Sequence, residues 1–515
     1  MKSQFAFLYK TSLFLVALVS LASCRDDFEP ERSTGNLEFS RDTLYLDTVF
    51  SNIGSSTYTL KVFNRSDAFI RIPQVGLARG ENSAYRLNID GRAGKVFNEV
   101  EILPRDSIFI FIETTLDAQN NDQIIYTDQI VFDAEPYTQK VELVTLVQDA
   151  EFLFPGRNAQ GIKETLQIGI DEAGEPILIE GFVLADDQLH FTNEKPYVIY
   201  GYAGIADGKT MIIEAGARLH FHDNSGIIVG NGGRIEANGS LSTDPETLEN
   251  EIILEGDRLE PEYAAVPGQW GTVWFTPGST GLLNYVTLKN SNLGILADGN
   301  TGNAEADIQL KNTQIYNSAL VGLYAVTASI DTENLVIGNS GISNLWIRMG
   351  GSYSFTHSTF ANYWIQSFRN TPAVQIDNFL ETEDALLTSG LTKADFVNCI
   401  VYGNRAEELG LRSVEAIPFN FSFSNSLIRF DDRFGEFSAL PNYDFTDTAK
   451  YQMIKRSEDP DFENTATNGY RIGLSSAAQA LGNAAGAALV PRDISGTERN
   501  NNPDAGAYQA TNLDN

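Results

Sequence analysis

The chain has 515 residues, of which 42% are hydrophobic. At roughly 100–200 residues per domain, this length suggests about two to four domains, each able to bury a core. The 36 basic and 68 acidic residues leave a net charge of −32. Because such a charge repels a phosphate backbone, nucleic acid is excluded as a partner, and the even spread of acidic residues favours solubility over a specialised tail.

Residues 1–23 have the composition of a secretory signal peptide. Lys2 and Lys10 precede the apolar run TSLFLVALVSLA, which is too short to span a membrane. The run ends in LASC, which resembles the lipobox of bacterial lipoproteins, and this resemblance implies that Cys24 becomes the lipidated (palmitate-bearing) N-terminus. The alternative is a chance cysteine after an ordinary signal peptide. Because Cys399 is the only other cysteine, we expect no intrachain disulfide and a buried Cys399.

An acidic tether follows over residues 24–36. Its sequence RDDFEP resembles the export signal that carries some bacterial lipoproteins to the outer face of the outer membrane, with Asp26, Asp27 and Glu29 as the matching carboxylates. The resemblance predicts an outer-membrane, lipid-anchored protein that faces the cell exterior. An inward-facing lipoprotein with an acidic tether is the alternative.

Residues 37–150 are predicted to form a β-sandwich. Short stretches of alternating hydrophobicity are separated by Asn, Asp, Gly and Pro turns, which is typical of about seven strands in two packed sheets. The pieces DTVF, LKVFNRS and LPRDSIFIFI resemble, in this order, immunoglobulin-like modules of the Hydin type. Such modules are spacers or interaction domains. The absence of an acid, base or nucleophile cluster in the sequence favours a spacer.

Residues 151–200 are assigned to a connector or N-terminal cap, and residues 201–435 to a right-handed parallel β-helix. Asn290, Asn317, Asn339 and Asn362 mark equivalent turns at intervals of 27, 22 and 23 residues. A period in the low twenties with strands of three to five residues suits a β-helix coil, which contributes one strand to each of three sheets. A leucine-rich repeat would show a Leu-rich frame, which is missing. Residues 379–391 break the period and are predicted to form a loop.

Asn312 and Asn334 each lie five residues before a turn Asn. Stacked amides at such positions can hydrogen-bond along the helix axis and satisfy backbone groups at the bends. A catalytic asparagine is the alternative, but a catalytic group is needed once and a structural one in every coil. The repetition therefore favours a structural ladder.

Residues 436–515 are predicted to close the β-helix. The segment DPDFENTATNGYRIGLSSAAQALGNA and the later RDISGTERNNNPDAGAYQ resemble the paired closing motifs of many bacterial right-handed β-helix domains with a pectate-lyase-like fold. Ala477 stands where those proteins usually carry proline, and Gln509 where they usually carry glutamate. The whole chain is therefore expected to be all-β, an immunoglobulin-like β-sandwich followed by a right-handed parallel β-helix. That fold hosts lyases, hydrolases and adhesins, so it assigns no activity.

An outward row of aromatic side chains is the best candidate for a binding surface. Leu323 and Leu345 fall on inward positions, which turns Tyr324 and Trp346 outward in consecutive coils, and Phe368 follows after the same interval of 22 residues. Such rings would form a strip that stacks on sugars, flanked by Arg348 and Arg369. The alternative is an external aromatic stack that only stabilises the fold and is covered by the 379–391 loop.

The stretch ARLHFHDNSG, residues 217–226, raises the question of a metal or acid–base site. Strand alternation turns His220 and His222 outward side by side, but a third ligand would have to come from another coil. The stretch is therefore interpreted as a coil of the solenoid. No catalytic residue, metal site or cofactor is assigned, although the many carboxylates would suit calcium. Trp270 and Trp274 are ambiguous, with packing favoured.

The function that these observations favour is a non-catalytic cell-surface lipoprotein, anchored to the outer membrane, whose β-helix presents a face for a polysaccharide or a surface-protein ligand. The alternative is a polysaccharide lyase or glycoside hydrolase whose site is assembled across coils. Residues of a polygalacturonase-like site are missing in their usual order, and Asp431 and Asp432 form the only Asp-Asp pair inside the repeats.

Overall fold

The computed structural model describes residues 29–116, 123–171, 173–303, 305–382, 385–499 and 502–513. Cys24, the signal peptide and most of the tether lie outside these residues. The chain divides into two compact units, Met1–Gln148 and Asp149–Asn515. Among the described residues, no helix has the length and apolar character needed to cross a membrane.

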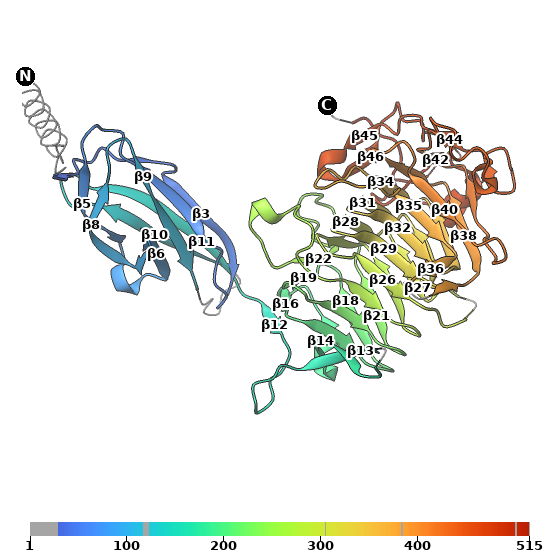
Figure 1. Cartoon of the computed structure of the whole chain (residues 1–515), viewed down its shortest axis with the longest axis horizontal. Coiled ribbons are helices and arrows are strands. Elements are labelled where there is room, and N and C mark those ends of the chain that lie inside the picture. The colour runs from blue at the N-terminus through green and yellow to red at the C-terminus, as the bar shows by residue number, and fades with distance from the viewer. Residues whose placement is uncertain are drawn as a thin grey trace, which may run out of the picture. The chain divides into compact units, whose positions relative to one another are not determined.

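The first unit is a β-sandwich of two sheets (Figure 1). The larger sheet has the order β1-β5-β10-β11-β3, with β8 paired to β5, and the smaller has the order β2-β4-β9-β6-β7. Leu60, Val62, Ile110 and Ile112 alternate with outward residues and are fully buried between the sheets. The strands are β1 (Glu31–Arg32), β2 (Glu38–Phe39), β3 (Thr43–Phe50), β4 (Tyr58–Phe63), β5 (Ile70–Leu77), β6 (Tyr85–Ile89), β7 (Arg92–Gly94), β8 (Val96–Ile102), β9 (Ser107–Thr114), β10 (Gln123–Phe132) and β11 (Gln139–Gln148).

The second unit is a parallel β-helix, in which successive coils add one strand to each of three long sheets (Figure 1). We name these sheets A, B and C. Sheet A contains β12 (Glu151–Leu153), β16 (Tyr197–Ile199), β19 (Arg218–Phe221), β22 (Ile252–Gly256), β25 (Val286–Lys289), β28 (Gln314–Ser318), β31 (Val336–Ser340), β34 (Thr359–Asn362), β39 (Ile400–Gly403), β42 (Leu427–Ile428) and β44 (Lys455–Arg456).

Sheets B and C have ten strands each. Sheet B contains β13 (Thr165–Ile170), β14 (Pro176–Val183), β17 (Tyr202–Ile205), β20 (Gly226–Val229), β23 (Val273–Phe275), β26 (Ile295–Asp298), β29 (Val321–Val326), β32 (Ser343–Arg348), β35 (Val374–Asp377) and β40 (Leu409–Arg412). Sheet C contains β15 (His190–Phe191), β18 (Thr210–Glu214), β21 (Arg234–Asn238), β24 (Thr280–Asn284), β27 (Ile308–Lys311), β30 (Ser329–Glu333), β33 (Gly351–Thr356), β38 (Leu391–Val397), β41 (Ser422–Ser424) and β43 (Tyr451–Gln452).

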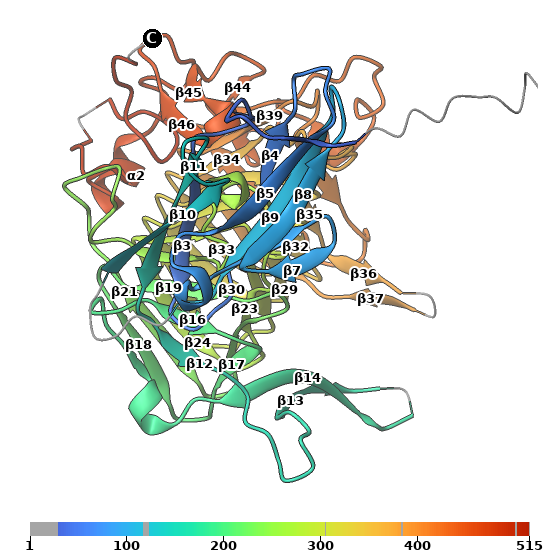
Figure 2. The same cartoon turned by 90° about the vertical axis from the view of Figure 1, so that its left-hand side faces the viewer.

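The all-β expectation is thus confirmed, and strands of the solenoid are already present within residues 151–200. The expected loop at 379–391 is largely an antiparallel hairpin of β36 (Phe379–Glu381) and β37 (Leu386–Thr388), which projects from the solenoid (Figure 2). Two short elements lie in the closing segment: an antiparallel pair of β45 (Phe462–Asn464) and β46 (Gly469–Ile472), and the helix α2 (Ala484–Leu489).

The core of the solenoid is built by columns of side chains in register. Along sheet C, Phe355, Phe396, Phe423 and Tyr451 pair strand to strand, with ring centroids 4.6, 4.4 and 6.0 Å apart. All four rings are buried, and each such side chain contributes about 1.5–3 kcal/mol relative to exposure. Cys399 is fully buried in the same core, as expected for a small hydrophobe.

The predicted asparagine ladders are present at two bends. Asn334 donates to Asn312 at 2.9 Å and Asn312 donates to Asn284 at 3.0 Å. Asn312 and Asn334 have positive φ angles of 46° and 52°, a conformation that asparagine tolerates better than most residues. His357, also with positive φ, contacts the amide of Asn398 through its Nε2 at 2.9 Å. The repeated asparagines are therefore structural.

The closing segment packs on the outer face of sheet A. Tyr470 is buried against Gly338, where an added Cβ would meet the ring at 2.3 Å, so only glycine fits. Arg499 donates to Asn334 at 2.7 Å and to Gln509 at 2.9 Å. Gln509, which stands in place of the usual glutamate, also donates to Asp504 at 2.7 Å. The closing motif and the asparagine ladder thus hold each other.

Candidate functional site

An aromatic and aliphatic row runs along the outer face of sheet B. Tyr324 on β29 pairs in register with Trp346 on β32, as predicted. In the other direction the row continues through Leu296 on β26 and Trp274 on β23. We call Trp274, Leu296, Tyr324 and Trp346 the sheet B strip. All four side chains are partly exposed, and at about 4.8 Å per strand the strip is roughly 14 Å long.

Trp346 is fixed in place by a buried carboxylate. Its Nε1 donates to Asp377 Oδ2 at 2.8 Å, and Gln375 Nε2 donates to Asp377 Oδ1 at 2.5 Å. Asp377 is only 1% exposed, and burial raises the pKa of its carboxyl above the usual range, although the two hydrogen bonds oppose this shift. The indole therefore keeps one orientation, with its polar edge directed at Asp377.

Arg348 joins the two rings of the strip. Its guanidinium lies over the Trp346 ring, 4.9 Å from the centroid, and donates to the Tyr324 hydroxyl at 3.1 Å. The Tyr324 and Trp346 rings meet edge to face, with centroids 5.8 Å apart and an interplanar angle of 84°. This arrangement stabilises the external stack and also presents two rings and a cation on one surface.

A charged row lies beside the strip. Arg348 follows the paired residue Ile347, Asp377 follows its partner Ile376, and Asp377 pairs in register with Arg412. Toward the N-terminus the same row reaches Asp298, whose pKa is raised by burial. Asp298 and Asp377 are three strand spacings apart, roughly 14 Å at about 4.8 Å per spacing. That separation exceeds the ~5–9.5 Å of paired glycosidase carboxylates, so the row holds no such pair.

The predicted place of Phe368 in the strip is wrong. Gln375 occupies the position next to Trp346 on β35, and Phe368 lies on the preceding loop, residues 363–373, where it is 89% exposed. The interval of 22 residues fails here because this loop lengthens the coil. Ile365, on the same loop, is 85% exposed.

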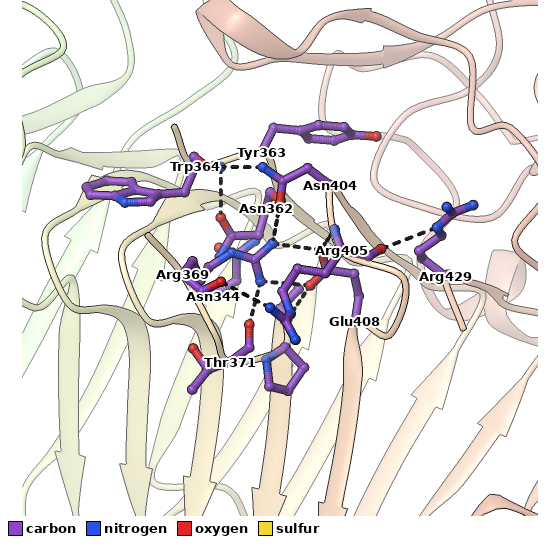
Figure 3. A network of polar contacts seen from close by, with 12 residues as sticks. Asn344, Asn362, Tyr363, Trp364, Arg369, Thr371, Asn404, Arg405, Glu408 and Arg429 are labelled. Carbon is purple, nitrogen blue, oxygen red and sulfur yellow. Dashed lines mark hydrogen bonds and ion pairs between the residues drawn. The ribbon is translucent and has the colours of Figure 1, made fainter. Parts of the chain in front are cut away.

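Loop 363–373 is held by a buried ion pair (Figure 3). The Arg369 guanidinium donates to both oxygens of Glu408, at 2.7 and 2.8 Å, and the two side chains are only 2% and 0% exposed. Arg369 also donates to Asn404 Oδ1 and to the Asn362 carbonyl, at 2.7 and 3.0 Å. Arg369 was expected to flank the strip, but it serves instead as the internal anchor of this loop.

The two histidines at the end of β19 form no metal site. His220 is 5% exposed and His222 is half-exposed, with its Nδ1 2.7 Å from Asp257 Oδ2 and its ring 4.5 Å from that of Tyr200. The Asp257 hydrogen bond raises the pKa of His222, whereas burial lowers that of His220. Within the described part of the chain, no cluster of three or more His, Cys, Asp or Glu side chains is arranged to hold a metal ion.

The remaining tryptophans separate into core and strip. Trp270 is fully buried, stacks on Phe221 at 4.5 Å and donates to the Lys289 carbonyl at 2.9 Å, so it has the packing role that was favoured. Trp274 belongs to the strip. The sequence period alone could have identified Trp274 and Leu296, but Gln375 and Asp377 required knowledge of the length of loop 363–373.

Comparisons with known proteins leave the chain unassigned. No known protein family matches its sequence, and no curated protein does. Among solved structures, a family 123 glycoside hydrolase from Clostridium perfringens is 10% identical with a TM-score of 0.17, over 24% of this chain and 30% of the hydrolase. The PapD-like domain 7 of human CEP192 is 8% identical with a TM-score of 0.16, over 25% of this chain and 94% of that domain.

The periplasmic chaperone SfaE is 14% identical with a TM-score of 0.16, over 22% of this chain and 58% of the chaperone. The matched part of the chain thus spans about a third of the length of the hydrolase. Likenesses at this level carry no argument for fold or function, so the function has to be argued from the surface of the molecule.

Proposed function

We propose that this protein binds glycans through the sheet B strip and does not cleave them. The observation that supports the proposal is the pair of Tyr324 and Trp346 in register on consecutive coils, with Arg348 and Arg412 in the adjacent row. Aromatic rings stack on the apolar faces of sugars, and guanidinium groups donate to their oxygens. A rigid solenoid keeps these groups at fixed spacing, which lowers the entropic cost of binding an extended chain.

The test is binding of purified protein to a panel of neutral and acidic polysaccharides. Removal of an aromatic anchor at the centre of a contact costs about 2 kcal/mol or more, so Trp346→Ala should weaken binding at least tenfold. Trp346→Phe keeps a ring but removes the hydrogen bond to Asp377, and should give an intermediate loss.

Phe434→Ala is the matched control, because Phe434 is 87% exposed and lies outside the strip. It should bind as the wild type does. If Trp346→Ala and the wild type bind with equal affinity, the strip is a stabilising stack and the proposal fails.

We also infer that the protein is attached to the outer membrane through lipid on Cys24 and faces the cell exterior. The support is the LASC sequence and the acidic residues that follow it. In this arrangement the sandwich of residues 37–150 acts as a spacer of the immunoglobulin-like type. The solenoid would then be free to meet polysaccharides or other surface molecules.

A polysaccharide lyase or glycoside hydrolase is the second candidate. The observation that favours it is Asp377, a carboxyl with a raised pKa between Arg348 and Arg412 in the same row. Against it, both Asp377 oxygens already accept hydrogen bonds from the protein. Release of new reducing ends or of unsaturated products from any bound polysaccharide, lost in Asp377→Asn, would establish the enzyme and overturn the non-catalytic proposal.

A further inference from the structure

A hollow of about 580 Å³ lies at the C-terminal end of the solenoid, beyond the last strand of sheet B. It is lined by residues of the segment 430–446, with Arg456 from β44. Its volume falls within the range of small-molecule sites, ~300–1,000 Å³. The sheet B strip does not extend into it, so this hollow is a separate feature of the surface.

The floor of the hollow consists of four aromatic rings. Phe430 packs against Phe437, Tyr443 and Phe445, with centroids 5.2, 5.1 and 5.0 Å away. Phe430 and Tyr443 are buried, and the Tyr443 hydroxyl accepts a hydrogen bond from the Leu411 amide at 2.6 Å. Phe437 and Phe445 are only partly buried. The floor is therefore preformed and offers ring faces to a ligand.

The rim carries three charged side chains. Asp432 is occupied, because its two oxygens accept from the amides of Glu436 and Phe437 at 2.9 and 3.1 Å. Asp444 is exposed, and only its Oδ1 accepts, from the amide and hydroxyl of Thr446 at 3.0 and 2.6 Å. The Arg456 guanidinium stacks 4.7 Å from the Phe445 centroid and forms no ion pair with any described residue.

We propose that this hollow binds a single neutral pyranose ring, such as the terminal sugar of a glycan chain. The proposal rests on the proposed glycan-binding function and adds a second, end-on site to it. The apolar face of the ring lies on Phe437 and Phe445. Asp444 Oδ2 accepts from ring hydroxyls, and Arg456 donates to a hydroxyl or ring oxygen.

Charge decides for a neutral sugar over an acidic one. Two carboxylates and one guanidinium line the hollow, and the hydrogen bonds from Thr446 lower the pKa of Asp444, so this carboxyl is ionised at neutral pH. An anionic ring would meet a net negative rim on a protein whose total charge is −32. Hydroxyl donors match the carboxylates without this repulsion.

The experiment is an NMR or calorimetric titration of the full protein with methyl α-glucopyranoside, methyl α-galactopyranoside and methyl α-mannopyranoside, with glucuronate as the anionic comparison. At least one neutral pyranoside should bind more tightly than glucuronate. Loss of a charged hydrogen-bond acceptor is worth about 1.5–3 kcal/mol, so Asp444→Ala should weaken its binding about tenfold or more. Ser438→Trp, which places a ring in the hollow, should abolish binding.

Asp447→Ala is the matched control: Asp447 also accepts from a backbone amide, that of Ala449 at 3.0 Å, but it does not line the hollow. This variant and Trp346→Ala should bind the monosaccharide as the wild type does. The proposal is overturned if no neutral pyranoside binds, if glucuronate binds more tightly, or if Asp444→Ala has no effect. Loss of polysaccharide binding in Trp346→Ala would support the strip under any of these outcomes, so the two proposals fail separately.

Discussion

His222 and His357 have opposite electrostatic environments. The hydrogen bond to Asp257 raises the pKa of His222, and burial lowers that of His357 to about 2. Because the folded-state pKa of His222 exceeds the unfolded value of about 6.5, its pair with Asp257 stabilises the fold fully below that pH and loses this effect as the pH rises through the folded-state pKa. For His357 the sign is reversed, and stability is lost as the pH falls from about 6.5.

We therefore expect His222 to titrate above pH 6.5 and His357 to stay neutral down to about pH 4. The chain has four histidines, so imidazole NMR signals can be assigned with single His→Gln variants. Asp257→Asn should return the pKa of His222 toward its ordinary value and leave that of His357 unchanged. A His222 that titrates at or below pH 6.5 in the wild type would contradict the structure.

Loop 363–373 shows how one element depends on a buried charge pair. Arg369→Met leaves the Glu408 carboxylate buried without its cation, and such a change costs about 3–5 kcal/mol in free energy of unfolding. Arg369→Met combined with Glu408→Leu should recover much of this loss, because an apolar pair needs no charge compensation. Urea denaturation gives the free energies, and hydrogen exchange of loop amides reports whether the loop itself opens.

The surface pair of Arg433 and Asp431 provides the comparison, since its side chains are 61% and 42% exposed. Arg433→Met should change the free energy of unfolding by less than about 1 kcal/mol. Equal costs for Arg369→Met and Arg433→Met would show that the Arg369 pair does not anchor the loop.

The same loop marks the limit of prediction from sequence. Regular coils repeat a period, so the pairing of Tyr324 with Trp346 and the ladder from Asn312 to Asn334 follow from counting residues. Phe368 was misplaced because an inserted loop changes the count without changing the hydrophobic pattern. The role of Asp377 depends on contacts between neighbouring coils, and one sequence does not specify those contacts.

The hollow at the C-terminal end was beyond sequence reasoning for a similar reason. Its aromatic floor is formed by an irregular segment that has no period to count. Asp432 was noticed only as part of an Asp-Asp pair, and the structure shows it closing a turn at the rim. Pockets made by irregular segments need coordinates.

At the scale of the whole molecule, two units with separate hydrophobic cores follow the predicted anchor. An independent sandwich core means that residues 37–150 can serve as a spacer without a contribution from the solenoid. A net charge of −32 keeps a surface-attached protein soluble and repels other acidic proteins. The strip and its arginines are then a local site on a generally acidic molecule.

This organisation predicts where the protein is found in cells. Added protease should digest the wild-type protein on intact cells while a periplasmic marker stays protected, because the acidic residues after Cys24 direct the chain outward. Cys24→Ser removes the only lipid attachment, and a lipid chain supplies about 0.8 kcal/mol per buried CH₂, so the variant should leave the membrane fraction. Cys399→Ser, which alters a buried thiol, is the control and should stay membrane-bound. Protection of the wild type on intact cells would contradict the outward orientation, and retention of Cys24→Ser in the membrane would contradict the anchor.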